Sequence, residues 1–195
     1  MSHNDTTDSE IIKELIAQFN QEGEQGPRGA IERLAEYGRV AVPELMEAAG
    51  RSRSSHVRAW ASVALAQLTG KEALPYLLTG LCDGRMSVRL RAVQAIAALG
   101  AVEACPNLID LLKDPSGGVR VNALTALVRL RCDIPPSELV ALISDSKWYV
   151  RQHAARAIGE LRMLNAVGIL EELLHDARPA VAKAARVALR ELAGE

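Results

Sequence analysis

Apolar residues recur along most of the chain with a period of 31 residues. Within each period they fall at positions 0, +4, +7, +8 and +11, which is the spacing of one face of an α-helix. Alanine holds positions +4 and +7 in every copy. The position-0 residues, called here the signature valines, are Val57, Val88, Val119, Val150 and Val181. The pattern therefore predicts five copies of one amphipathic helix.

A second, shorter apolar stripe follows each of the first four copies. Its paired positions are Leu77 and Leu81, Leu108 and Leu112, Leu139 and Ile143, and Leu170 and Leu174. An aspartate then precedes the next copy; in "DPSGGVR", Asp114 is expected to cap the helix and Pro115 to open its first turn. Each period is thus a helical hairpin. Because one hairpin cannot bury its own apolar faces, stacked hairpins are expected to form an all-α solenoid.

The N-terminal part departs from this pattern. Residues 9–51 keep helical apolar spacing but lack the signature, so they are interpreted as an N-terminal helix and a degenerate capping repeat. Thr7 and Glu10 have the spacing of a capping box. The polar residues 1–8 are predicted to be a disordered tail. Residues 52–195 are predicted to hold four full repeats and a C-terminal half repeat.

Arginine follows the signature valine in four repeats, and each of these arginines has an aspartate 25 residues further on. Pairing within one repeat would leave Arg58 facing Ser52 and Asp176 facing Ala182. Pairing with the aspartate that opens the next repeat leaves no member unmatched. We therefore predict a ladder of structural salt bridges. Its pairs are Arg58–Asp83, Arg89–Asp114, Arg120–Asp145 and Arg151–Asp176.

Composition narrows the function classes. The chain is 49% apolar with a formal net charge of −1 and a pI near 6.4, so it lacks the basic footprint of a nucleic-acid binder. The basic stretch "RSRSSHVR" at 51–58 is interpreted as a solvated loop that leads into a helix. No apolar run reaches the ~18 residues of a membrane span, and no signal-peptide pattern is present. A cytoplasmic location is predicted.

The cysteines and histidines give little sign of a site. Cys82, Cys105 and Cys132 are odd in number and form no CxxC pair. A disulfide or a zinc site is therefore not expected, and a reducing compartment fits. Cys105 shares its repeat position with apolar residues, so we expect it to be buried as a small hydrophobe. The histidines are scattered, and neither a metal nor another cofactor is predicted.

The segments "DPSGGVRVNALTAL" and "DSKWYVRQHAARAIGEL" resemble the short HEAT-like repeat first named for phycobilisome lyases. The resemblance covers about residues 52–193. It implies a right-handed superhelix in which the Val-Arg helices line the concave side. Related repeats occur in an iron-dependent hydroxylase that uses His-Glu pairs, which are absent here, and in DNA glycosylases with a basic concave face, which the near-neutral charge disfavours.

The same resemblance assigns positions −2, −1, +2, +3, +6 and +10 from the signature valine to the concave side. These positions vary between repeats while the signature stays constant, and several hold residue types that anchor interfaces. The alternative is that Trp60 packs on a neighbouring repeat and Trp148 covers a helix end. The predicted partner-binding residues are His56, Trp60, Arg91, Gln94, Asn122, Arg129, Trp148, Tyr149, Gln152, His153 and Arg156.

No nucleophile–base pair, phosphate loop or metal-ligand spacing is visible, so no catalytic residue is assigned. The sequence favours a non-catalytic scaffold whose concave face binds a protein or peptide partner, and neither nucleic acid nor a membrane is expected as a partner. The alternative is a subunit of a bilin lyase or a related tetrapyrrole-handling protein. Its aromatic residues would then stack on the chromophore and its arginines would pair with propionates.

Overall fold

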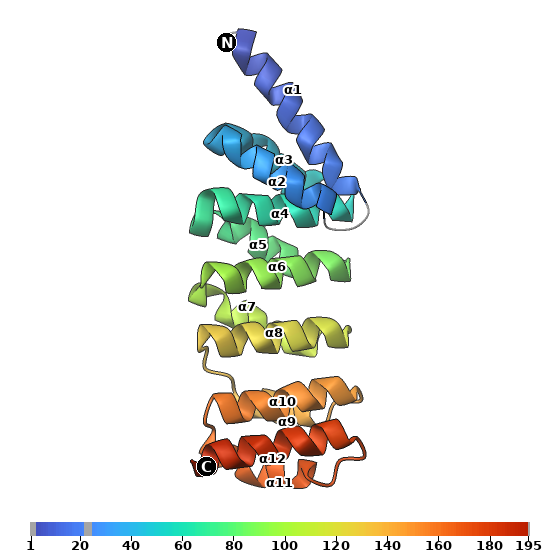
Figure 1. Cartoon of the computed structure of the whole chain (residues 1–195), viewed down its shortest axis with the longest axis vertical. Coiled ribbons are helices and arrows are strands. Elements are labelled where there is room, and N and C mark those ends of the chain that lie inside the picture. Colours follow the sequence, from blue (N-terminus) through green and yellow to red (C-terminus); the bar gives the residue numbers. More distant parts are fainter. Residues whose placement is uncertain (1–2, 22–24, 195) are drawn as a thin grey trace. The chain divides into compact units, whose positions relative to one another are not determined.

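The computed structural model describes residues 3–21 and 25–194, and every regular element in these ranges is helical (Figure 1). The predicted all-α fold of helical hairpins is confirmed. The chain divides into two compact units, unit 1 (Met1–Ala101) and unit 2 (Val102–Glu195).

Unit 1 contains an N-terminal helix, the degenerate repeat, one full hairpin and the first helix of the next. Helix α4 packs against α3 on one side and α6 on the other, and α5 packs against α6. The helices are α1 (His3–Ala17), α2 (Gln25–Tyr37), α3 (Val42–Arg51), α4 (Ser55–Thr69), α5 (Leu74–Leu81) and α6 (Met86–Leu99). Short 3₁₀ turns join them at η1 (Gln18–Asn20), η2 (Gly38–Ala41) and η3 (Gly70–Ala73).

Helix α1 begins earlier than the sequence suggests. It runs from His3, so the prediction of a disordered tail is wrong for residues 3–8, and Thr7 lies inside the helix rather than at its cap. Ile12 and Leu15 are fully buried, and α1 contacts α2, α3 and α4. This buried face fixes the helix, and the polar residues before it extend the same helix. Residues 1–2 of the predicted tail lie outside the described residues.

Unit 2 repeats the hairpin pattern. Helix α10 packs against α8, α9 and α12, while α7 contacts α8 and α11 contacts α12. The helices are α7 (Cys105–Asp110), α8 (Gly117–Leu130), α9 (Pro136–Ile143), α10 (Trp148–Glu160), α11 (Val167–Leu173) and α12 (Pro179–Ala193). The 3₁₀ turns are η4 (Val102–Ala104), η5 (Leu111–Lys113) and η6 (Leu164–Ala166).

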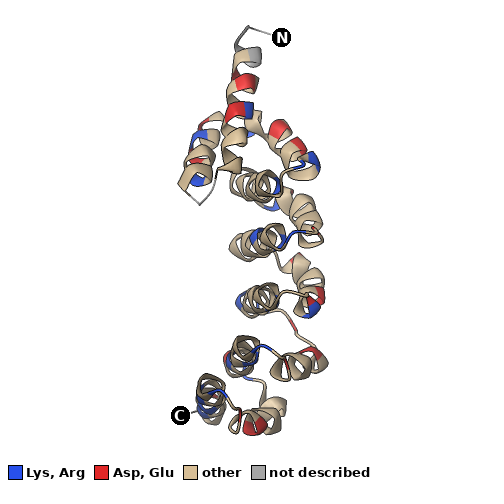
Figure 2. Ribbon diagram, turned by 90° about the vertical axis from the view of Figure 1, so that its right-hand side faces the viewer, with Lys and Arg blue, Asp and Glu red and all other residues tan. Residues whose placement is uncertain are grey.

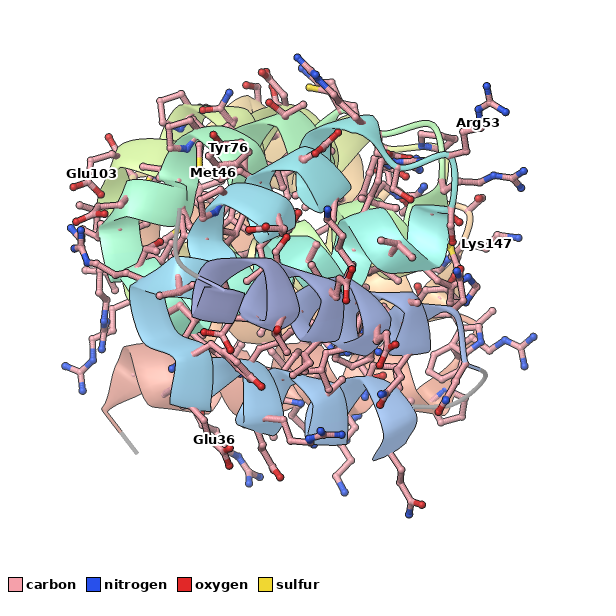
Figure 3. All side chains as sticks on the ribbon, turned by 90° about the horizontal axis from the view of Figure 1, so that it is seen from above. Glu36, Met46, Arg53, Tyr76, Glu103 and Lys147 are labelled. Carbon is pink, nitrogen blue, oxygen red and sulfur yellow. A yellow bond between two sulfur atoms is a disulfide. The ribbon has the colours of Figure 1, made fainter. Side chains whose placement is uncertain are left out.

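The repeat signature makes the core of each unit. In unit 2, for example, Val150 and Ala154 are 0% exposed. Small side chains let neighbouring first helices approach closely. At the contact of α10 and α12, a Cβ added to Gly159 would lie 2.9 Å from Ala188 Cα, so only glycine fits there without movement. Helix α5 carries no charged residue (Figure 2), while exposed Glu36 and Arg53 point away from the ribbon (Figure 3).

The aspartates between hairpins do not cap the helices directly, as the sequence suggested. Helix α8 begins at Gly117 with Ser116 as its N-cap, and Asp114 lies two residues earlier. The Asp114 carboxylate accepts a hydrogen bond from the Ser116 backbone N–H at 2.8 Å. Asp83 accepts the same bond from Arg85 at 2.8 Å. The aspartate therefore shapes the turn before the helix, because its side chain mimics a backbone turn.

Candidate functional site

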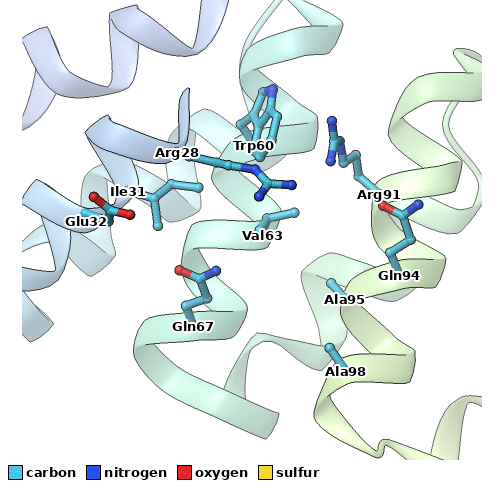
Figure 4. A pocket seen from close by; sticks show the side chains of 10 residues that line it. All are labelled: Arg28, Ile31, Glu32, Trp60, Val63, Gln67, Arg91, Gln94, Ala95 and Ala98. Carbon is cyan, nitrogen blue, oxygen red and sulfur yellow. The ribbon is translucent and has the colours of Figure 1, made fainter. Parts of the chain in front are cut away.

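Each unit has a groove that is lined by the first helices of its hairpins. Groove 1 lies in unit 1 between α2, α4 and α6 and has a volume of about 380 Å³. Its lining residues are Arg28, Ile31, Glu32, Trp60, Val63, Gln67, Arg91, Gln94, Ala95 and Ala98 (Figure 4). Groove 2 lies in unit 2 between α8 and α10, with a volume of about 290 Å³. Its lining residues are Leu124, Thr125, Val128, Arg129, His153, Arg156, Ala157 and Glu160.

Three of the six variable repeat positions, +3, +6 and +10, line these grooves, except that position +3 of α8 (Asn122) lines neither. On α4 they are Trp60, Val63 and Gln67. On the helices that carry the signature valine, the other three positions, −2, −1 and +2, line neither groove; Ala59, for example, is only 3% exposed. Arg28 of the degenerate repeat holds position +2 in the same register and does line groove 1. Positions +3, +6 and +10 are three or four residues apart and so share one face of the helix. Positions −2 and −1 are the first two residues of each of these helices and lie at its start.

Trp60 lines groove 1 but is only 5% exposed, and partner binding by this residue stays a prediction. The guanidinium carbon of Arg91, from the next repeat of unit 1, lies 3.9 Å from the centre of the Trp60 ring. This geometry is a cation–π contact. The tryptophan therefore packs on a neighbouring repeat, which was the alternative interpretation, and it forms the floor of groove 1 beneath Arg91.

Figure 4 shows how side chains from three helices converge in groove 1. Arg28 reaches from α2 toward Trp60 and Val63, and Arg91 approaches from α6. Sequence reasoning missed Arg28, because the degenerate repeat lacks the signature valine. Extending the 31-residue spacing back into the degenerate repeat would have placed α2 at the groove. Glu32, which also lines groove 1, lies 31 residues before Val63 and therefore holds the same +6 position.

Groove 2 is more polar at its rim. Arg129 and Arg156 are exposed, and Arg156 Nη2 lies 3.8 Å from Glu160 Oε1. His153 Nδ1 is 2.8 Å from the Tyr149 carbonyl oxygen, to which it donates a hydrogen bond. The floor is aliphatic and includes Leu124. The groove can therefore hold an anionic or hydrogen-bonding group over an apolar base.

The aromatic pair at the start of α10 lies outside groove 2. Trp148 is 40% exposed, and its ring meets that of Tyr149 edge to face with centres 5.9 Å apart. Tyr149 is half-buried and covers Gly117, where an added Cβ would lie 2.5 Å from the tyrosine hydroxyl oxygen. The pair is thus partly a packing element, and partner binding by Trp148 stays a prediction.

Three other predicted contact residues also lie outside both grooves. His56 is exposed at the start of α4, and Gln152 is half-buried on α10. The Asn122 side-chain amide donates to the Gly118 carbonyl oxygen at 2.9 Å, within its own helix. The grooves thus collect Trp60, Arg91, Gln94, Arg129, His153 and Arg156 from the predicted set.

The arginine–aspartate ladder has the geometry that the sequence predicts. Nε of the arginine lies 2.7 Å from Oδ2 of the aspartate in each of the pairs Arg58–Asp83, Arg120–Asp145 and Arg151–Asp176. Each arginine also donates through Nη1 to a backbone carbonyl six residues earlier, as Arg89 does to Asp83 at 2.8 Å. It therefore joins the start of its own repeat to the start of the next. The Arg89–Asp114 pair has one residue in each unit and stays a prediction.

These hydrogen bonds shift the acidity of the ladder. The hydrogen bond from Arg58 lowers the pKa of Asp83 below its ordinary value, against a smaller opposing effect of burial. The hydrogen bond from Arg151 lowers the pKa of Asp176 in the same way. Both carboxylates are accordingly stabilised in the charged form by the fold.

Cys105 and Cys132 form a disulfide, which overturns the expectation that no disulfide is present. Their Cα atoms are 5.9 Å apart. Cys105 opens α7, and Cys132 follows Arg131, whose left-handed backbone (φ 57°) ends α8. The stacking of α7 on α8 brings the two cysteines together, and their spacing in the sequence does not predict this contact. Cys105 is half-buried rather than buried, and Cys82 is a free, exposed thiol.

Neither a metal-binding cluster nor a membrane-spanning helix is found among the described residues. No group of three or more His, Cys, Asp or Glu side chains within these residues is arranged to hold a metal ion. A bilayer-spanning helix is not found in this part of the chain either, because each helix there is too short or too polar.

Family models match two parts of the chain. The model described as PBS lyase HEAT-like repeat matches residues 57–81 and 88–114. The model described as HEAT repeats matches residues 134–195. A search of curated protein sequences finds no match.

Solved structures with a similar fold include natural and engineered proteins. A chain of the CpcE–CpcF complex of phycocyanin lyase from Nostoc has a TM-score of 0.65 and 24% sequence identity. The match covers 78% of the present chain and 65% of the length of the lyase chain. The Escherichia coli protein YibA has a TM-score of 0.73 and 19% identity, covering 97% of this chain and 75% of its own. An engineered protein has a TM-score of 0.54 and 21% sequence identity, and the match covers 94% of the present chain and 97% of the engineered chain. These likenesses show the fold.

Proposed function

The chain is a HEAT-like repeat protein, and we propose that it is a non-catalytic scaffold that binds a protein or peptide partner on its first-helix faces. One observation carries this proposal. Variable repeat positions +3, +6 and +10, apart from Asn122, contribute to the lining of a groove in unit 1 and of another in unit 2. In repeat proteins such positions form extended binding surfaces, because the constant positions are occupied by the stack.

The side chains in the grooves are suited to binding rather than to nucleophilic catalysis. The only hydroxyl among the lining residues of groove 2 is that of Thr125, and it donates to the Val121 carbonyl oxygen of its own helix at 2.8 Å. It is therefore not engaged with His153, as an activated nucleophile would be. The lining of groove 1 combines arginine, glutamine and small apolar residues, which recognise charge, amide groups and shape.

A tetrapyrrole-handling role has weaker support. The match to the PBS lyase HEAT-like repeat supports this role. A tetrapyrrole-binding site also requires an exposed aromatic face on which the chromophore can stack. Trp60 is 5% exposed, with Arg91 stacked on its ring, so it offers little face. Titration of the chain with free bilin tests this role: growth of bound visible absorbance would support it, and an unchanged spectrum would remove it.

The cytoplasmic location predicted from the sequence stays a prediction. The Cys105–Cys132 disulfide weighs against it, because disulfides persist mainly in oxidising compartments. Trapping the thiols with an alkylating reagent in the producing cell decides the matter. Three alkylated cysteines would support a reducing compartment, whereas alkylation of Cys82 alone would support an oxidising one.

The scaffold proposal is tested by affinity capture from the producing organism followed by mass spectrometry. Charge reversal in groove 1 or groove 2 should remove the partner, while charge reversal elsewhere on the same units should not. A separate alanine double variant of Trp148 and Tyr149 tests the aromatic pair. The groove variants are R28E/R91E and R129E/R156E, and the matched controls are R33E on α2 and K183E on α12, both exposed and outside the grooves.

The expected result is one partner set that the wild type and both controls recover and that at least one groove variant loses. Circular dichroism must give the same helix content for every variant. Recovery of the same proteins by wild type and both groove variants would refute the grooves as the binding surface.

A further inference from the structure

Groove 1 has a charge pattern that identifies the kind of partner it fits. We propose that it binds an extended, acidic segment of a partner protein, with one aspartate or glutamate carboxylate held between Arg28 and Arg91 above Trp60. This inference rests on the scaffold function and specifies the ligand of one of its grooves.

The stacked arginine is the first element of the site. Arg91 lies 3.9 Å above the Trp60 ring, so one face of its guanidinium group is covered by an apolar surface. The five N–H donors of a guanidinium group lie in its plane, and stacking on a ring does not itself use these donors. A carboxylate can accept two parallel hydrogen bonds in this plane. Because Trp60 holds the guanidinium group in place, less side-chain entropy is lost on binding.

The second element is the placement of the charges. Arg28 and Arg91 both extend toward Trp60, while Glu32 lies beyond Ile31, at the edge of the groove (Figure 4). The charged residues that line groove 1 are thus two arginines and one glutamate, whereas the whole chain carries a net charge of −1. A carboxylate is attracted to the interior, and Glu32 repels a second acidic group at the edge.

The third element favours a peptide over a small free acid. Gln67 and Gln94 are exposed and point into the groove from α4 and α6. A glutamine amide both donates and accepts, so it matches the N–H and C=O groups of an extended backbone. The volume of about 380 Å³ is near the lower end for small-molecule pockets. It suits a side chain and a short stretch of backbone that continues beyond the groove.

The test is a selection of randomised peptides of about ten residues, displayed on phage, against the folded full chain. The expected result is enrichment of peptides that carry Asp or Glu at one shared position. The enriched peptide should lose about 10-fold or more in affinity for R28Q or R91Q, because a paired charge is removed. R33Q, on the same helix as Arg28 but outside the groove, should bind as the wild type does.

Further measurements separate carboxylate recognition from a general loss of structure. R91K keeps the charge but cannot form the bidentate pair, so its affinity should fall between those of the wild type and R91Q. In a W148F background, Trp60 is the sole tryptophan, and the enriched peptide should change its fluorescence. Replacing the shared acidic residue by its amide should reduce affinity about as much as R91Q does.

Two outcomes would overturn the inference. Enrichment of groove-dependent peptides without a shared acidic residue would refute carboxylate recognition and leave the scaffold function standing. Binding of free glutamate as tightly as the peptide would refute the peptide assignment. If no peptide is enriched and affinity capture also yields no groove-dependent partner, both the inference and the scaffold proposal fail.

Discussion

The two grooves use the same repeat positions but differ in chemistry. Position +3 contributes Trp60 and Arg91 to groove 1, where the arginine stacks on the buried tryptophan. In groove 2 it contributes His153, which is half-buried and bonded to a backbone carbonyl. Helix α2 adds a third wall to groove 1, whereas the lining of groove 2 comes from α8 and α10. The repeat thus fixes where a variable residue points, and the residue that occupies the position decides what the groove can bind.

The two units also differ in what holds them together. In unit 1 the Arg58–Asp83 pair joins neighbouring repeats, and the buried face of α1 covers part of the stack. Unit 2 has the ladder pairs Arg120–Asp145 and Arg151–Asp176 as well as the disulfide. We therefore expect the stability of unit 2 to depend more on a covalent link and on charged pairs than that of unit 1.

Removing the disulfide should have the largest effect on this contrast. The change C105S/C132S opens a loop closed across 27 residues, which lowers the free energy of unfolding of unit 2 by about 3–4 kcal/mol in the chain-entropy model. Hydrogen exchange resolved by mass spectrometry measures each unit in the same sample. Protection should fall in peptides from unit 2 and stay within error in peptides from unit 1.

The matched control for this change is C82S, because Cys82 is exposed and unpaired with another cysteine. It should leave both units as stable as in the wild type. Adding a reductant to the wild type should reproduce the effect of C105S/C132S. Equal loss of protection in both units would show that the disulfide does not distinguish them.

Breaking one pair of the ladder should have the next largest effect. R120A leaves the Asp145 carboxylate, whose side chain is 10% exposed, without its arginine. The expected cost is about 1–3 kcal/mol in the stability of unit 2, because a largely buried carboxylate loses its charged hydrogen-bond partner and keeps only the Lys147 backbone N–H. R58A should have a similar effect in unit 1, which would show that the ladder serves both units. Urea denaturation combined with hydrogen exchange measures the two changes.

A surface ion pair provides the control for the ladder. Arg39 pairs with Glu72 at 2.9 Å, but the two side chains are 78% and 63% exposed. R39A should therefore change stability by less than about 1 kcal/mol. The ladder would lose its structural interpretation if R120A left stability unchanged and abolished partner binding.

The sequence predicted the scaffold of both units better than the chemistry of their grooves. The 31-residue spacing of valine, alanine and leucine determines the helices and their buried faces, and counting partners was enough to pair Arg58 with Asp83. The burial of Trp60 depends on how closely α6 approaches α4, which periodicity does not set. The meeting of Cys105 and Cys132 likewise depends on the stacking of α7 on α8.

Acid should weaken both units and so reduce the contrast between them. Hydrogen bonds from arginines lower the pKa of Asp83 in unit 1 and of Asp176 in unit 2 below the ordinary value of 3.8. The unfolded chain therefore takes up these protons at a higher pH than the folded chain. The stabilisation is fully present above the unfolded pKa, and it is lost as the pH falls through the folded pKa, from about pH 5 downward.

Denaturation by urea between about pH 7 and about pH 3 measures this loss, with hydrogen exchange to assign it to a unit. D83N should flatten the pH dependence of unit 1 and D176N that of unit 2, because each change removes a group whose proton uptake differs between the folded and unfolded states. D133N, at an exposed position, is the matched control. An acid response that is unchanged in D83N and D176N would place the acid-sensitive groups outside the ladder. A response confined to one unit would show that the pairs Arg58–Asp83 and Arg151–Asp176 are not equivalent, despite their equal 2.7 Å distances.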